Sequence, residues 1–189
     1  MGHIKKTRFA AILGVGLLAT AGTGVAVAQG GLSAHLALSN QIFNLQVSQM
    51  DGDNISLFTD SDKMHNGTEA ITRLRISKVK VKDVCMAAPM DVPGMGHKTF
   101  QMQVPGQNFE AKNLVIGAKD LQGGLKLEGA QIGIDTHQVD PNAAPGTWGI
   151  AANKIQAISQ KIKVTSMAAD ELTAAGGKIK IVNDEDAQC

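Results

Sequence analysis

Apolar and polar residues alternate with a period of two along most of the chain beyond residue 40. In residues 42–47, Phe43, Leu45 and Val47 fall on one face, with polar residues between them. Such a period places successive side chains on opposite faces of a β-strand, one packed and one facing water. The same alternation recurs in residues 74–76, 79–81, 100–104, 125–127, 162–164 and 179–181. All of these segments are predicted to be strands.

Turn-forming dipeptides punctuate these strands, because Gly supplies positive φ angles and Pro and Asp favour turns. They are Asp51-Gly52, Asn66-Gly67, Pro93-Gly94, Pro105-Gly106, Gly123-Gly124, Pro145-Gly146 and Gly176-Gly177. The pattern predicts an all-β fold, a single domain of short antiparallel strands. It is either a sandwich or an elongated, solenoid-like sheet. A one-residue slip of the alternation at Ser77-Lys78 suggests a bulge.

Helix is an alternative in two places, so the fold class allows at most one or two short helices. Residues 153–163 carry isoleucines at near-helical spacing, and residues 167–175 are rich in Ala. A loose internal similarity also relates residues 113–127 to residues 153–181, because each has an apolar stretch, a Gly pair and an alternating segment. Two loose copies agree with a solenoid-like sheet and do not exclude a sandwich.

Residues 1–28 have the three parts of a secretory signal peptide. Lys5, Lys6 and Arg8 form a basic start, an uncharged apolar stretch follows, and small residues precede the expected cleavage after Ala28. The alternative is a retained membrane anchor, but Gly and Thr residues interrupt the apolar stretch. We therefore expect an exported domain of residues 29–189, extracellular or at the cell surface, without a transmembrane span after cleavage.

Charge and aromatic content exclude nucleic acid as a partner. The formal net charge of the whole chain is +1, and removing the leader's three cations makes the remainder slightly acidic. The chain has five Phe, one Trp and no Tyr. Nucleic-acid binding needs a basic surface and usually aromatic stacking platforms, and both are missing here.

The chain has two cysteines, Cys85 and Cys189, and we expect them to form a disulfide. An even pair in an oxidising compartment is usually bonded. Closing a loop of about 100 residues contributes at most about 4.7 kcal/mol in the chain-entropy model. The alternative is two free thiols, with Cys189 able to dimerise the protein.

Three segments resemble a secreted actinobacterial family of unknown function, whose members genome annotation often labels "cholesterol esterase". They are residues 1–10, the Val84-Cys85 strand followed by residues 91–96, and residues 112–116. The resemblance extends over nearly the whole chain and implies secretion and a β-rich domain. It implies no catalytic residues.

The esterase label finds no support in the sequence motifs. An α/β-hydrolase presents its nucleophile in Gly-x-Ser-x-Gly, and this pentapeptide is absent. A Ser–His–Asp set can form on other folds, since geometry rather than order defines it; Ser56 and His65, for example, could meet across a hairpin. We expect no such set and no enzymatic activity.

Metal-ligand chemistry occurs in two places, although the sequence predicts no metal site and no cofactor. The first group of residues, beside Cys85 and Met102, has the soft side chains that suit Cu(I): Met86, Met90, Met95 and His97. Met also fills irregular cores. The second group offers oxygen ligands in residues 51–54 and 60–62, but lacks the calcium-loop pattern with its terminal Glu.

A stripe of cations marks one predicted strand: Arg73, Arg75, Lys78, Lys80 and Lys82. Lysines alternate in the same way in residues 161–163 and 178–180. If these strands adjoin, one face of the sheet is strongly positive and could meet anionic cell-wall polymer or lipid headgroups. Lysines on an exposed or edge strand also protect against aggregation, which is the simpler interpretation.

The sequence therefore predicts a secreted, non-enzymatic structural or binding protein of the cell envelope or extracellular matrix. Its partners would be anionic polymer, lipid headgroups or further copies of itself. The first alternative is a lipid-directed protein, either a carrier of apolar ligand or an ester hydrolase. The second is a copper or calcium binder.

Overall fold

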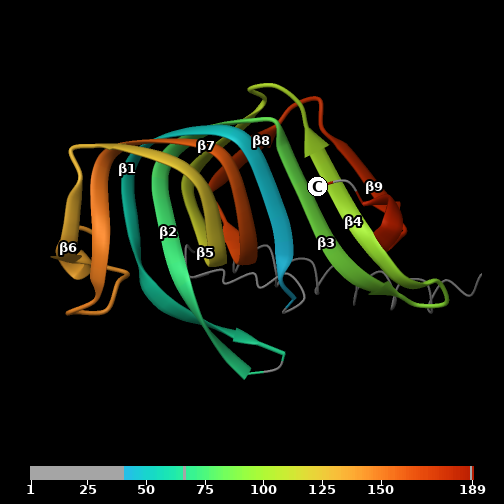
Figure 1. Cartoon of the computed structure of the whole chain (residues 1–189), viewed down its shortest axis with the longest axis horizontal. Helices are drawn as coiled ribbons and strands as arrows, with labels where there is room; N and C mark the ends of the chain where they lie inside the picture. The colour runs from blue at the N-terminus through green and yellow to red at the C-terminus, as the bar shows by residue number, and fades with distance from the viewer. Residues whose placement is uncertain (1–40, 66, 188) are drawn as a thin grey trace, which may run out of the picture. The chain divides into compact units, whose positions relative to one another are not determined.

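The computed structural model describes residues 41–65, 67–187 and 189, and confirms the all-β fold class. The described residues form one antiparallel sheet of nine strands and two 3₁₀ turns (Figure 1). The predicted signal peptide, residues 1–28, lies outside the described residues. The elements are β1 (Phe43–Met64), β2 (Gly67–Lys82), β3 (Val84–Val92), β4 (Gly96–Val104), β5 (Phe109–Glu128), β6 (Gln131–Asp135), η1 (Thr136–Gln138), β7 (Trp148–Ala168), β8 (Glu171–Ala174), β9 (Lys178–Val182) and η2 (Asp184–Asp186).

Four long strands close the sheet on itself. β1 pairs with β2, β2 with β5, β5 with β7, and β7 again with β1. β3, β4 and β9 extend the sheet from the first residues of β1, while β6 adds to β7 and β8 to β5. The chain thus buries an apolar core between strands of a single sheet and does not form a sandwich of two.

The core lies on the face that the alternation predicts. Phe43, Leu45 and Val47 of β1 are buried, as are Ile162 and Val164 of β7. The described interior contains small apolar cavities, one of about 10 Å³ beside Leu45 and Val47 and one of about 30 Å³ between β1, β2, β5 and β7. That is the volume of about one water molecule in the liquid.

Neighbouring strands bend (Figure 1), and a row of polar residues, two of them with left-handed φ angles, crosses four strands at one level of the pairing. The row consists of Asn153 of β7, Asn54 of β1, Ser77 of β2 and Asn113 of β5. On either side of it the strands stay in one unbroken register, because Asp53 and Ile55 face residues of β2 and β7 with no shift. We call these four residues the corner row.

At the corner row each strand exchanges its inner and outer faces. Two successive outward residues, such as Ser77 and Lys78, lie between the buried Ile76 and Val79. Asn54 adopts a φ of 49°, a left-handed conformation that Asn tolerates better than most residues. The slip predicted at Ser77-Lys78 is therefore in the right place, but it is a bend shared by four strands rather than a bulge of one.

Two of the predicted turns, at residues 51–52 and 123–124, are wrong, and a second bend in the strands lies near them. Asp83 and Ser159 have φ angles of 53° and 52°, and Gly123 has a φ of 149°. Residues 123–124 lie within β5 at this second bend. Residues 51–52 lie within β1 between the two bends. The sequence predicts chain reversals at Asp51-Gly52 and Gly123-Gly124, but both dipeptides lie within continuous strands. β1, β5 and β7 consequently have 20 residues or more.

Both segments with a possible helix are extended. Residues 153–163 belong to β7, and residues 167–175 contain its end and β8. The near-helical spacing arises because the left-handed Ser159 shifts the alternation by one residue. Ile155 and Ile162 consequently face the core, whereas Ile158 is exposed. No helix of the described residues is long and apolar enough to cross a membrane.

Candidate functional site

The five cations of the predicted stripe all lie on β2, but they separate into different environments. Arg73 is buried, and Nη2 of its guanidinium lies 2.8 Å from Oδ2 of Asp60 and 2.7 Å from Oδ1 of Asp62. Its Nη1 donates to Oγ of Ser166 at 3.0 Å. Arg73 is therefore part of the packed structure and presents no charge to a partner.

The carboxylate of Asp62 is the acceptor at the centre of this buried cluster. Thr165 Oγ1 donates to it at 2.6 Å and Ser166 Oγ at 2.8 Å. Burial raises the pKa of Asp62, but the hydrogen bonds from Thr165, Arg73 and Ser166 outweigh it, so its pKa lies below the ordinary 3.8. Asp62 is therefore charged and fully engaged at neutral pH.

Arg75 pairs with a residue from the loop after η1. Its Nε lies 2.9 Å from Oδ2 of Asp140, which also accepts from Ser56 Oγ at 2.8 Å. Burial raises the pKa of Asp140. Hydrogen bonds from Asn142 and Ser56 and the charge of Arg75 lower it by more, so the pKa lies below the ordinary value. About a third of the Arg75 side chain remains exposed.

The three lysines of the stripe are exposed. Lys80 Nζ lies 3.1 Å from Oε1 of Glu110, while Lys78 and Lys82 form no ion pair with another described residue. The strands that carry the other predicted lysines do not adjoin β2. β1 separates β2 from β7, and β9 lies at the far end of the path beyond β3 and β4. The condition for a continuous positive face is thus not met.

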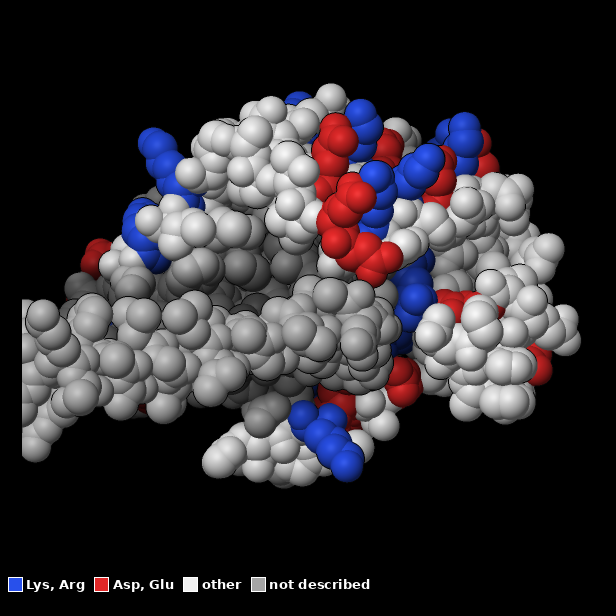
Figure 2. All heavy atoms as spheres, turned by 180° about the vertical axis from the view of Figure 1, so that it is seen from behind, with Lys and Arg blue, Asp and Glu red and all other residues white. Residues whose placement is uncertain are grey.

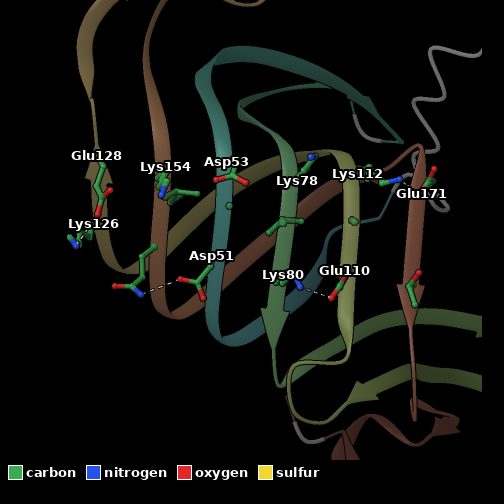
Figure 3. Close-up of a pocket in the computed structure, with 16 residues that line it drawn as sticks. Asp51, Asp53, Lys78, Lys80, Glu110, Lys112, Lys126, Glu128, Lys154 and Glu171 are labelled. Carbon is green, nitrogen blue, oxygen red and sulfur yellow. Dashed lines mark hydrogen bonds and ion pairs between the residues drawn. The ribbon is translucent and has the colours of Figure 1, made fainter.

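The charged side chains nearest to Lys78 and Lys80 instead line a hollow of about 480 Å³, which we call the charged hollow (Figure 3). β5 contributes to it twice, and β7, β1, β2 and β8 complete it. Its ionisable residues are Asp51, Asp53, Lys78, Lys80, Glu110, Lys112, Lys126, Glu128, Lys154 and Glu171. Acids and lysines are equal in number, so the hollow has no net charge.

The centre of the charged hollow is Asp53, which faces Lys78 on β2 and Lys154 on β7. These three side chains form no ion pair with each other or with other described residues, so their charges remain available. Two strand spacings separate the lysines, about 10 Å at the backbone. The centre can therefore accept carboxylate or phosphate oxygens at two points and an ammonium group between them.

The rim of the charged hollow consists of exposed ion pairs, which are Lys80–Glu110, Lys112–Glu171 and Lys126–Glu128. Pairs of this kind contribute at most about 1 kcal/mol each. They can open at little cost when a charged partner arrives. Figure 2 shows the same interspersed distribution on the face opposite to Figure 1, where basic and acidic side chains lie beside one another.

A second hollow of about 480 Å³ begins on the other side of the corner row. Asn54, Ser77, Asn113 and Asn153 line it, together with Gln131, Asn142 and the Arg75–Asp140 pair. We call it the amide hollow, because its polar lining is mostly primary amides. A primary amide offers two donors and a carbonyl acceptor, so the hollow suits neutral hydroxyl and amide groups.

The four side chains that suit Cu(I) do not converge. Met86 is buried in the core, whereas Met95 lies in the turn after β3 and is 60% exposed. The strand from Met86 to Val92 alone spans about 20 Å, and Met95 lies in the turn beyond it. His97 contacts Asp91 across the hairpin, and Met90 lies opposite Lys98. No group of three or more His, Cys, Asp and Glu residues able to hold a metal occurs in the described part of the chain.

Of the predicted calcium ligands, Asp60 and Asp62 bind Arg73. Asp51 accepts hydrogen bonds from Gln49 and Gln156, whereas Asp53 forms no ion pair with another described residue. Ser56 and His65 do not meet. Ser56 donates to Asp140, and His65 follows the last residue of β1, about 30 Å along the strand. In residues 41–65 and 67–187, the hydrogen bonds join no serine to a histidine.

The disulfide between Cys85 and Cys189 is present, with its Cα atoms 5.7 Å apart. It ties the last residue to β3. Thr99 Oγ1 also donates to Oδ1 of Asp184 at 2.7 Å, and Lys98 Nζ to Oδ1 of Asn183 at 2.6 Å. The polar tail is thus held against β4 by hydrogen bonds as well as by the bridge.

Sequence reasoning missed the acidic strand at the centre of the site and both hollows. The available signal was a doubled polar position in each strand, with one charged and one neutral residue. The four pairs are Asp53-Asn54, Ser77-Lys78, Lys112-Asn113 and Asn153-Lys154. Because the strands are antiparallel, these pairs place every charge on one side of the corner row and every neutral residue on the other.

Comparison with curated proteins and with solved structures finds no match to the chain. A family profile, in contrast, matches residues 39–189, which include all the described residues. The chain belongs to this family, described as a family of unknown function (DUF6230).

Proposed function

We propose that the protein is exported and acts as a non-enzymatic binding protein of the cell envelope, with the charged hollow as its binding surface. The observation that carries the proposal is the set of Lys78, Asp53 and Lys154 at the centre of a 480 Å³ hollow, where none of the three forms an ion pair with a described residue. Ligand sites typically have volumes of about 300–1,000 Å³. The partner is an envelope polymer that bears carboxylate or phosphate groups together with ammonium groups.

Export is supported by the signal-peptide pattern of residues 1–28 and by the Cys85–Cys189 disulfide. Disulfides persist in oxidising compartments and are rare in the cytosol. The carrier alternative is less favoured, because the interior cavity of about 30 Å³ in the described residues is far smaller than an apolar ligand needs.

The binding proposal is tested by retention on insoluble peptidoglycan at increasing salt concentration. Exposed charges are screened beyond about 8 Å at physiological ionic strength, so retention should fall as salt rises. The Lys78→Glu/Lys154→Glu variant should lose retention. Lys82→Glu/Lys161→Glu is the matched control, because it makes the same charge change on β2 and β7 at two exposed positions outside the hollow. Equal loss in both variants, or retention that ignores salt, would refute the proposal.

A further inference from the structure

The charged hollow and the amide hollow are two halves of one surface. At each of the four strands the chain passes from one hollow to the other within two successive residues, as at Asp53-Asn54 of β1. The corner row is the shared boundary. On β1, Asp53 lines one hollow and the next residue, Asn54, lines the other, so a ligand bound in one hollow lies one residue from the edge of the other.

Two amides of the amide hollow have no hydrogen-bond partner within the described part of the chain. The side chains of Asn54 and Asn153 lie on paired strands at the same level, and both are exposed. Neither side chain hydrogen-bonds to another described residue. Strand spacing sets their backbones about 4.8 Å apart. Two adjacent amides at this spacing can bind successive hydroxyl or amide groups of a ligand.

Backbone conformation explains only part of this lining. Asn54 and Asn113 have φ angles of 49°, for which Asn is a favoured residue. Asn153 does not have a positive φ, so the backbone does not require an amide there. Arg75 also lines the hollow, with its Nε 2.9 Å from Oδ2 of Asp140 and a third of its side chain exposed. A guanidinium has five N–H donors in total.

We propose that the two hollows bind one ligand, a glycan chain that carries short peptides with free ammonium and carboxylate groups. The inference rests on the proposed function and specifies its substrate class. The neutral, hydroxyl-rich glycan lies against Asn54 and Asn153. The peptide, which has both signs of charge, lies against Lys78, Asp53 and Lys154.

Simpler ligands fit only half of the surface. A continuous polyanion would place negative groups beside Asp51, Asp53 and Glu128, where like charges repel. A neutral glycan would leave the charges of the first hollow without partners. A peptide without glycan would offer the amide hollow only the peptide's own backbone groups.

The test compares two forms of one probe, insoluble peptidoglycan with its peptides intact and the same material after an amidase has removed them. The intact form should retain the full chain several-fold better than the stripped glycan, and free peptide should compete weakly. This comparison needs no variant, so it does not depend on any variant folding. Equal retention on the two forms overturns the inference.

Variants then separate this inference from the proposed function. Asn54→Gly/Asn153→Ala removes both amides, and Gly keeps the left-handed conformation available at residue 54. This variant should bind intact peptidoglycan several-fold more weakly and lose its residual retention on the stripped glycan, while the charged hollow keeps the preference for the intact form. Asn44→Ala, on β1 outside both hollows, should bind normally. If the amide variant binds normally while Lys78→Glu/Lys154→Glu fails, the amide hollow has no role and only the proposed function stands.

Discussion

Nη2 of Arg73 donates to Oδ1 of Asp62 at 2.7 Å, and both side chains are more than nine-tenths buried. The pair joins β2 to the last part of β1, and Ser166 and Thr165 of β7 join it from the side. A cation predicted to face solvent is thus the centre of a buried polar network.

Replacing Arg73 by Met should destabilise the fold strongly. The change leaves the carboxylate of Asp62 buried without its positive partner, and breaking a buried pair in this way costs about 3–5 kcal/mol. Urea unfolding should show a lower midpoint with an unchanged slope. Lys82→Met on the same strand should have almost no effect, because Lys82 is exposed. Similar midpoints for the two variants would contradict the role of the pair.

Stability should fall in acid through Asp62 and Asp140. The pKa of each is below its ordinary value of 3.8 in the folded protein. The folded state therefore binds fewer protons than the unfolded state, and the resulting stability is present above pH 3.8. It is lost as pH falls through the folded pKa values.

The free energy of unfolding, measured from about pH 6 to about pH 3, checks this linkage. Asp140→Asn should flatten the acid part of the curve, because one of the two contributing carboxyls is gone. Asp186→Asn, an exposed change in η2, should leave the shape of the curve unaltered. An identical slope for Asp140→Asn and the parent protein would exclude the contribution of Asp140.

Gly117 should not tolerate a side chain. A Cβ at this position would lie 2.5 Å from Ser166 Oγ, 2.6 Å from Thr165 Oγ1 and 2.7 Å from Asp62 Oδ2. Gly117→Ala should therefore cost about 1–3 kcal/mol, the usual range for overpacking. Gly124→Ala is the control, since its nearest contact would be 3.7 Å. Thermal unfolding of both variants decides the point.

Removing the disulfide should loosen the C-terminal tail first. The loss of a native bridge typically costs about 2–5 kcal/mol. In the Cys85→Ser/Cys189→Ser variant, hydrogen exchange should accelerate in β9 and η2 before it changes in β1.

The intact mass of the oxidised protein should lie about 2 Da below that of the reduced protein, since a disulfide lacks two hydrogens. Two alkylatable thiols in unreduced protein would disprove the bridge.

Period-two alternation was enough to predict the strands and the buried face, because residues such as Phe43 and Val164 report directly on which side is packed. The disulfide could be predicted from the pair of cysteines. The length of the strands could not be predicted, because Gly52 and Gly123 have the same sequence signal whether a chain reverses or bends. The charge balance of the site could not be predicted either, since Asp53 of β1 comes between β2 and β7 only through pairing of distant segments.

The corner row also gives the sheet a means of choosing its register. In a regular sheet, sliding one strand by two residues keeps every inward side chain inward, so alternation alone does not distinguish these alignments. Here a two-residue slide of β2 would move Ser77 away from Asn54 and set the bends of adjacent strands at different heights. The doubled polar positions thus fix the register of neighbouring strands. A hairpin paired in another register is disfavoured by the mismatch of its backbone bends, before any side chain is packed.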